Sequence, residues 1–283
     1  MPRLNSNGRG ALRTIAVLLV RSNLVISVAA TSVALWTARL AGLDPEFLPL
    51  FIVFAATFFV YSLNRLTDIK EDSRNVPGRA AFVSRYGTAL FAAGAGLYLV
   101  AIAGAFAFGL PGAPFLALPA VVAGLYSLVR VKRLLFVKNL VVGGSWGIIP
   151  LGVGVYYGVV RTPEILVSFG LVTVMLTVAA AVFDIKDIEG DRAEGIRTAP
   201  VVFGPGATRT GAFAATVAVA VALVALVVAG VVPERFLSAL GFLAYVAAYV
   251  PFATTDRGPL FYGLVIDGEH VFFAALVVAI YGV

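Results

Sequence analysis

Residues 165–191 read ILVSFGLVTVMLTVAAAVFDIKDIEGD, an uncharged apolar run followed at once by a group of acidic residues. The run from Ile165 to Phe183 is close to the roughly 20 residues that a helix needs to cross the hydrocarbon core of a bilayer. Asp184 follows it directly. The stretch therefore predicts a membrane-spanning helix that ends in carboxylates at the membrane surface.

The composition of the whole chain indicates the same class of protein. Of its 283 residues, 60% are hydrophobic and 13% are charged, about half the charged fraction of a typical soluble domain. This composition favours an integral membrane protein, because a water-exposed surface needs more charge. It excludes an ordinary soluble enzyme, a disordered chain and a nucleic-acid-binding domain. The absence of cysteine excludes thiolate catalysis, and the single histidine excludes a multi-histidine metal site.

Similar apolar runs recur along the chain, and they predict nine transmembrane helices in one all-α domain over residues 1–283. These runs cover about residues 14–36, 47–63, 88–108, 113–129, 140–160, 165–183, 211–232, 236–253 and 260–283.

The basic residues fall mainly on alternate connections between these runs. The other side of the predicted membrane has only Arg39, Arg161 and Arg235. Because Lys and Arg favour cytoplasmic loops, we expect a multi-pass protein of the cell membrane with its N-terminus in the cytoplasm and its C-terminus outside. We expect no removable signal peptide. The long connections at about residues 64–87 and 184–210 are then both cytoplasmic.

Those two connections hold eight of the 15 acidic residues. In each, polar residues are spaced so that one helical face would carry them: Asn64, Asp68 and Asp72 in the first, and Asp184, Asp187 and Asp191 in the second. Two facing acidic rows repel each other unless a cation lies between them. Oxygen ligands suit Mg²⁺, which commonly binds carboxylates together with substrate phosphates, and nearby Lys and Arg can contact phosphate. A solvated helix end explains one such row well but two matching rows poorly, so the pattern favours a diphosphate site.

With these motifs the sequence resembles the UbiA family of intramembrane prenyltransferases, which has an Asp-rich motif after its second helix and another after its sixth. Flanking segments that resemble the family are Arg21-Ser22-Asn23, Tyr126-Ser127 with Lys132-Arg133 and Asn139, and the run from Gly195-Ile196-Arg197-Thr198 to Gly204. The chain departs from the common pattern at Arg65, which directly follows the motif Asn, and at residues 75–80.

The resemblance implies a ring of nine helices around a central cavity, with Mg²⁺ held by Asn64, Asp68, Asp72, Asp184, Asp187 and Asp191. Asp68, Asp72, Asp187 and Asp191 are then the catalytic carboxylates. Candidate substrate contacts are Arg21, Asn23, Tyr126, Lys132, Arg133, Asn139, Lys186 and Arg192. The implied partners are an isoprenyl diphosphate donor, a lipophilic acceptor and the lipid bilayer, while the oligomeric state stays open.

Several alternatives remain at this point. An aromatic quinone precursor is the default acceptor, with a glycerol-phosphate lipid or a carotenoid as alternatives. The same scaffold could act as a terpene cyclase, and a secondary transporter is the candidate outside enzymes. Asp267, Glu269 and His270 form a further polar cluster in the last span. Our first interpretation of it is a structural hydrogen bond, and the second is proton acceptance from the acceptor.

Overall fold

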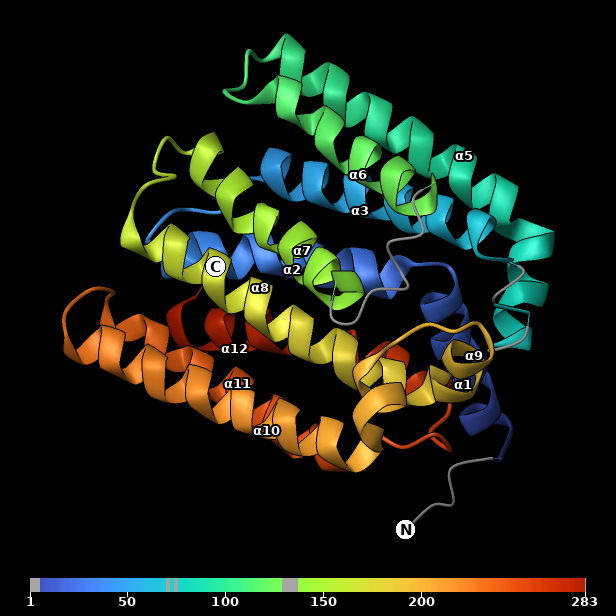
Figure 1. The fold of residues 1–283 in the computed structure, drawn as a ribbon. Coiled ribbons are helices and arrows are strands. Elements are labelled where there is room, and N and C mark those ends of the chain that lie inside the picture. The colour runs from blue at the N-terminus through green and yellow to red at the C-terminus, as the bar shows by residue number, and fades with distance from the viewer. Residues whose placement is uncertain (1–5, 70–71, 74–75, 129–136, 283) are drawn as a thin grey trace.

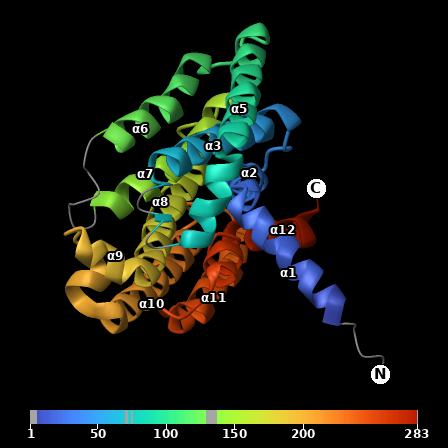
Figure 2. The ribbon, with the colours of Figure 1, turned by 90° about the vertical axis from the view of Figure 1, so that its right-hand side faces the viewer.

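The computed structural model describes residues 6–69, 72–73, 76–128 and 137–282, and within these ranges it contains helices and no strand. Both views in Figures 1 and 2 show α5 and α6 on one side of the bundle, α10 and α11 on the other, and α2 and α8 between them. The α-helices are α1 (Ser6–Arg21), α2 (Leu24–Leu40), α3 (Phe47–Thr67), α5 (Pro77–Ala107), α6 (Ala117–Leu128), α7 (Val137–Tyr156), α8 (Pro163–Phe183), α9 (Ile188–Ala193), α10 (Ala199–Val228), α11 (Ala239–Tyr249) and α12 (Glu269–Tyr281). Shorter helical segments are η1 (Ala113–Leu116), η3 (Asp184–Asp187), η4 (Glu234–Ser238), η5 (Val250–Phe252) and η6 (Phe261–Ile266).

The helices confirm an all-α multi-span membrane protein but not the predicted count of nine spans. In the described part of the chain, seven helices are long and apolar enough to cross a bilayer, and α1 with α2 adds an eighth if this bent pair is one span. Helix α6 occupies the position of the predicted fourth span, but its described part has only 12 residues. It is too short to cross by itself.

The first predicted span, residues 14–36, is broken rather than continuous. Helices α1 and α2 meet at an angle of 67°. Between them Asn23 has the left-handed backbone conformation (φ 66°), which Asn tolerates better than most residues. Its buried side chain donates a hydrogen bond to Ser62 Oγ in α3 (3.4 Å). The break therefore places a polar pair inside the bundle, where a straight apolar helix would have none.

The two predicted loops are mostly helical. Helix α5 begins at Pro77, whose fixed φ suits the first turn of a helix, and α10 begins at Ala199. Gly204 (φ 83°) breaks the regular path of α10 immediately before Pro205. The sequence predicts that this span starts at Gly211, because the kinked first turns of α10 resemble a loop in sequence.

Helices α7 and α8 pack closely because glycines of α7 face α8. A β-carbon on Gly143 would overlap the carbonyl oxygen of Thr173, and one on Gly147 would overlap the Thr173 hydroxyl. Small residues four apart are typical of close helix contacts in membranes. This packing aligns the start of α7 with the end of α8.

We predict that Gly147→Val destabilises the protein by about 1–3 kcal/mol, because the added side chain must push α7 away from Thr173. Thermal unfolding in detergent, followed by tryptophan fluorescence, measures the effect. Gly144 is the matched control, since nothing lies within 4 Å of a β-carbon added there. Equal loss of stability in Gly147→Val and Gly144→Val would contradict the packing argument.

Candidate active site

A cavity of about 840 Å³ lies inside the bundle. One face of α3 lines it along most of the helix, at positions Pro49, Ile52, Ala56, Val60 and Asn64. At a rise of about 1.5 Å per residue, this face is roughly 22 Å long. Its Asn64 end is polar and charged, and the remaining walls are mainly aliphatic and aromatic. The cavity can therefore hold a molecule with an anionic head and a long apolar tail.

The first acidic motif lies at the polar end, where α3 ends. The amide of Asp68 donates to the carbonyl of Asn64 (2.9 Å), and the amide of Asp72 donates to that of Asp68 (2.9 Å). All three residues line the cavity. The three side chains that we expected on one helical face thus all lie at the cavity.

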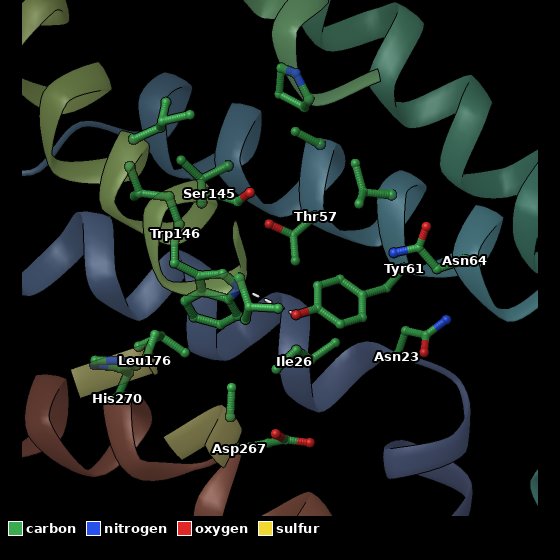
Figure 3. Close-up of a pocket in the computed structure, with 18 of the residues that line it drawn as sticks. Asn23, Ile26, Thr57, Tyr61, Asn64, Ser145, Trp146, Leu176, Asp267 and His270 are labelled. Atoms are coloured by element: carbon green, nitrogen blue, oxygen red, sulfur yellow. Dashed lines mark hydrogen bonds between the residues drawn. The ribbon is translucent and has the colours of Figure 1, made fainter. Parts of the chain in front are cut away.

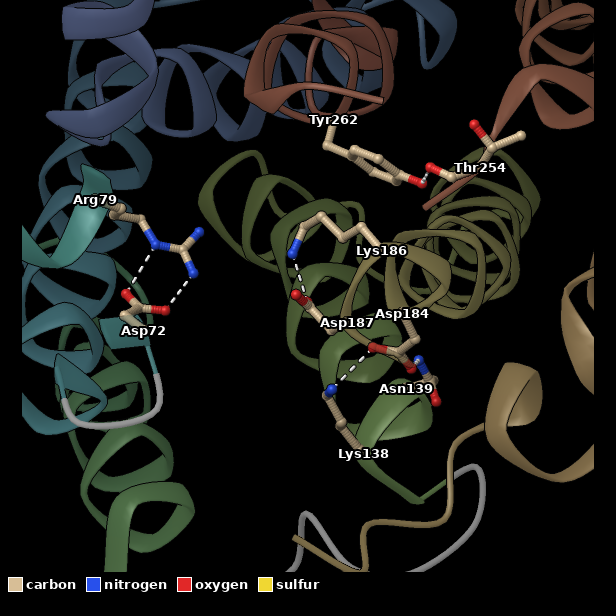
Figure 4. A network of polar contacts seen from close by, with 9 residues as sticks. All are labelled: Asp72, Arg79, Lys138, Asn139, Asp184, Lys186, Asp187, Thr254 and Tyr262. Carbon is tan, nitrogen blue, oxygen red and sulfur yellow. Dashed lines mark hydrogen bonds and ion pairs between the residues drawn. The ribbon is translucent and has the colours of Figure 1, made fainter. Parts of the chain in front are cut away.

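Asp72 is ion-paired with Arg79 in the first turn of α5. Both oxygens of the buried carboxylate accept hydrogen bonds from the guanidinium, with Nε at 2.8 Å from Oδ2 (Figure 4). Such a two-point pair fixes the geometry of both groups. Arg79 also lines the cavity, so it can contact a bound anion.

The second motif follows α8, with Asp184 and Asp187 in the short helix η3. Asp184 accepts hydrogen bonds from Lys138 Nζ (2.8 Å) and Asn139 Nδ2 (3.0 Å), both at the start of α7. Asp187 is ion-paired with Lys186. Asp184, Asp187, Lys138 and Lys186 line the cavity, opposite Asp72 and Arg79 in Figure 4. The third member of the motif, Asp191, is buried in α9 and does not line the cavity.

The donor set suits a hard divalent cation. Carboxylates of both motifs line the cavity, and Asn64 Oδ1 is buried with no hydrogen-bond partner among the described residues. Within those residues, however, no three Asp, Glu or His side chains converge closely enough to enclose a metal ion. The ligand chemistry therefore fits Mg²⁺, provided that phosphate oxygens complete the coordination.

More positive charge lines the same end of the cavity. Arg21 lies at the bend between α1 and α2, and a β-carbon on Gly78 would overlap its guanidinium. Arg65 extends from the last turn of α3, where Asp72 and Asp267 attract it. Asn23 also lines the cavity, beside Arg21. Arg21, Asn23, Asn139 and Lys186 thus lie at or next to the predicted site.

The remaining predicted substrate contacts are Arg192, Tyr126, Lys132 and Arg133, and the structure describes the side chain of Arg192 alone. Arg192 is exposed on α9 and does not line the cavity. Lys132 and Arg133 lie outside the described residues, as does the side chain of Tyr126, whose backbone belongs to α6. Their contacts with substrate stay predictions.

Several residues at this site were missed from the sequence. Lys138, Arg65 and Arg79 were counted as loop charges, although their positions beside the motifs and Asn139 were a usable signal. Deeper in the cavity, Trp146 Nε1 donates a hydrogen bond to the hydroxyl of Tyr61 (3.2 Å; Figure 3). No local pattern marks that pair, because its partners are 85 residues apart.

The polar cluster of the last span divides into separate parts. Glu269 is buried and accepts a hydrogen bond from Tyr249 (2.6 Å), which agrees with the structural interpretation. His270 is buried and stacks near Trp36, Trp146 and Phe242. Asp267 makes neither kind of contact, and it lines the cavity.

Comparisons with known proteins agree with this geometry. The model of the UbiA prenyltransferase family matches residues 24–259. A digeranylgeranylglyceryl phosphate synthase of Thermococcus sibiricus is 37% identical over 78 residues, a match that spans 26% of this chain and 26% of that protein.

Two solved structures have a similar fold. An apo UbiA homologue from Aeropyrum pernix K1 gives a TM-score of 0.66 at 19% identity, over 89% of this chain and 97% of that chain. A structure described as digeranylgeranylglyceryl phosphate synthase in membranes gives 0.58 at 16% identity, over 93% of this chain and 95% of that chain. Because the family model covers most of the sequence, the chain belongs to the UbiA prenyltransferase family.

Proposed function

We propose that this protein moves an isoprenyl group from an isoprenyl diphosphate to a glycerol-phosphate lipid and releases diphosphate in a Mg²⁺-dependent reaction. The observation that carries the proposal is the cavity itself, whose polar end is lined by both acidic motifs and whose remaining walls are apolar. We also propose that this end faces the cytoplasm, because most basic residues lie on that side.

The diphosphate head of the donor binds at the polar end. Asn64, Asp68 and Asp72 with Asp184 and Asp187 would hold Mg²⁺, and Asp191 would support the second motif from α9. Bound Mg²⁺ supplies positive charge that stabilises the leaving diphosphate. Arg79, Lys138 and Lys186 pair with motif carboxylates and line the same end of the cavity. Their charged side chains can also donate hydrogen bonds to phosphate oxygens there.

The allylic part of the donor lies below the charged groups, along α3. Tyr61 is about one helical turn deeper than Asn64, and its hydrogen bond to Trp146 holds both rings at the cavity wall. Ring faces stabilise developing positive charge, and an apolar wall keeps water from the reacting carbon. The carbon–oxygen bond of the donor can therefore break without water attacking the reacting carbon.

Two observations favour a glycerol-phosphate acceptor over the aromatic quinone precursor that was the default from sequence. One is the similarity over 78 residues to the synthase of Thermococcus sibiricus. The other is the presence of Arg21 and Arg65 at the cavity, in addition to the three cations paired with the motifs. A phosphate on the acceptor would pair with Arg21 and Arg65, whereas the diphosphate of the donor alone would not need them.

The test of the function uses purified protein in lipid vesicles with geranylgeranyl diphosphate, Mg²⁺ and geranylgeranylglyceryl phosphate. We expect an ether-linked product by mass spectrometry, at a rate reduced about 100-fold or more by Asp68→Asn or Asp187→Asn. Glu189→Gln is the matched control, because this acid is exposed two residues after Asp187 and lies outside the cavity. Product from an aromatic acceptor only, or a hydrocarbon formed without acceptor, would refute the proposed acceptor.

A second prediction concerns the added positive charge. We expect Arg21→Gln to raise the KM for the glycerol-phosphate acceptor about 10-fold or more, because a charge-assisted hydrogen bond contributes about 1.5–3 kcal/mol. The KM for the donor should change less than about threefold if Arg21 binds the acceptor. Arg161→Gln serves as the control, since Arg161 is exposed and remote from the cavity. A larger effect on the donor than on the acceptor would assign Arg21 to the diphosphate instead.

A further inference from the structure

The last span contributes a carboxylate that the donor site does not use. Asp267 is partly buried and lines the cavity, and it has no hydrogen bond or salt bridge to the other described residues. The charged side chains that face it are Arg65 from α3, Arg79 from α5 and Lys186 from η3, together with Glu269 on its own element. It therefore stands beside the polar end of the cavity without belonging to either acidic motif.

The backbone around Asp267 is shaped in a way that regular helix would not produce. Its amide donates to the carbonyl of Tyr262, five residues earlier (3.1 Å), which makes a wide turn between η6 and α12. Gly268 follows, and a β-carbon there would overlap the carbonyl of Leu264. Wide turns of this kind occur often at functional sites. Figure 3 shows the carboxylate extending from the last span toward the side of the cavity where Asn23 lies.

Transfer to a hydroxyl group requires a proton acceptor, and the other acidic groups near the cavity are committed elsewhere. Asp72, Asp184 and Asp187 pair with cations, and together with Asp68 they belong to the proposed metal site. Glu269 is bound to Tyr249. His270 also lines the cavity, but both of its ring nitrogens are buried among aromatic rings, and it is not a carboxylate. Among the residues that the structure describes, Asp267 is the carboxylate left to face an acceptor.

We propose that Asp267 is the catalytic base that accepts the proton of the acceptor hydroxyl, an inference that rests on the proposed function. In this step the bond between the prenyl carbon and the diphosphate oxygen breaks, and its electron pair leaves with diphosphate. The acceptor hydroxyl oxygen forms the new bond to the prenyl carbon. Its proton passes to a carboxylate oxygen of Asp267, which becomes neutral.

The test measures cleavage of the donor separately from transfer of the prenyl group to the acceptor. Asp267→Asn keeps the size and polarity of the side chain but cannot accept the proton. We expect it to lower the rate of ether formation about 100-fold or more, in line with the usual contribution of a general base. Donor affinity, and donor consumption without acceptor, should stay within about threefold of the wild-type values. Asp267→Glu should restore part of the transfer rate.

Glu269→Gln is the matched control, because it replaces a neighbouring buried acid in the same wall and can still accept the hydrogen bond from Tyr249. Its ratio of transfer to donor consumption should equal that of the wild type. The inference is overturned if Asp267→Asn transfers at the wild-type rate, or if transfer and donor consumption fall in parallel, as a purely structural role requires. If the wild-type protein forms no glycerol ether at all, the proposed function and this inference both fall.

Discussion

Charge balance at one end of the cavity is the constraint on which the rest of this structure depends. Carboxylates inside a membrane-embedded bundle are costly unless a cation or hydrogen-bond donor faces them. Here Asp72 faces Arg79, Asp184 faces Lys138 and Asn139, and Asp187 faces Lys186. Two of these pairs join separate helices, α5 to the segment after α3 and α7 to the segment after α8. The same contacts therefore hold the helix ends together and keep the site ready for a phosphate.

The apolar part of the fold supports this arrangement. Glycines of α7 allow close packing on α8, which aligns Lys138 and Asn139 with Asp184. The core beside it contains Trp36, Met175, Phe242 and Phe273, all fully buried between α2, α8, α11 and α12. This core fills the part of the bundle next to the cavity, and the cavity lies between α3, α6, α7 and the last span. Packing thus fixes the charged end of the cavity, and the rest of the cavity has mainly apolar walls.

Much of the fold could be predicted from the sequence, because long apolar runs have few alternatives to a membrane span. Asn64, Asp68 and Asp72 of the first motif are linked by backbone hydrogen bonds four residues apart, and all three line the cavity. The 67° bend at Asn23 could not be predicted, because an apolar run carries no signal for a change of direction. In the second motif, spacing alone assumes one continuous helix. The structure instead has η3, with its tighter turn, followed by α9, and Asp191 ends up away from the cavity.

The ion partners were harder to predict than the motifs themselves. Arg79 and Lys138 are near in space to Asp72 and Asp184 only because of how α5 and α7 pack. Local sequence could show that these cations exist, but not which carboxylate each one neutralises. The same holds for Asp267, which the sequence places in an apolar span but which only the wide turn before α12 directs to the cavity.

We propose that the two motifs act together on one diphosphate through divalent cations. A double-mutant cycle can test this, with binding of a non-cleavable prenyl thiodiphosphate measured by calorimetry for wild type, Asp68→Asn, Asp187→Asn and the double variant. We expect binding that requires Mg²⁺ and a coupling energy of about 1 kcal/mol or more between the two positions. Tight binding in the presence of a metal chelator, with strictly additive effects of the two substitutions, would contradict it.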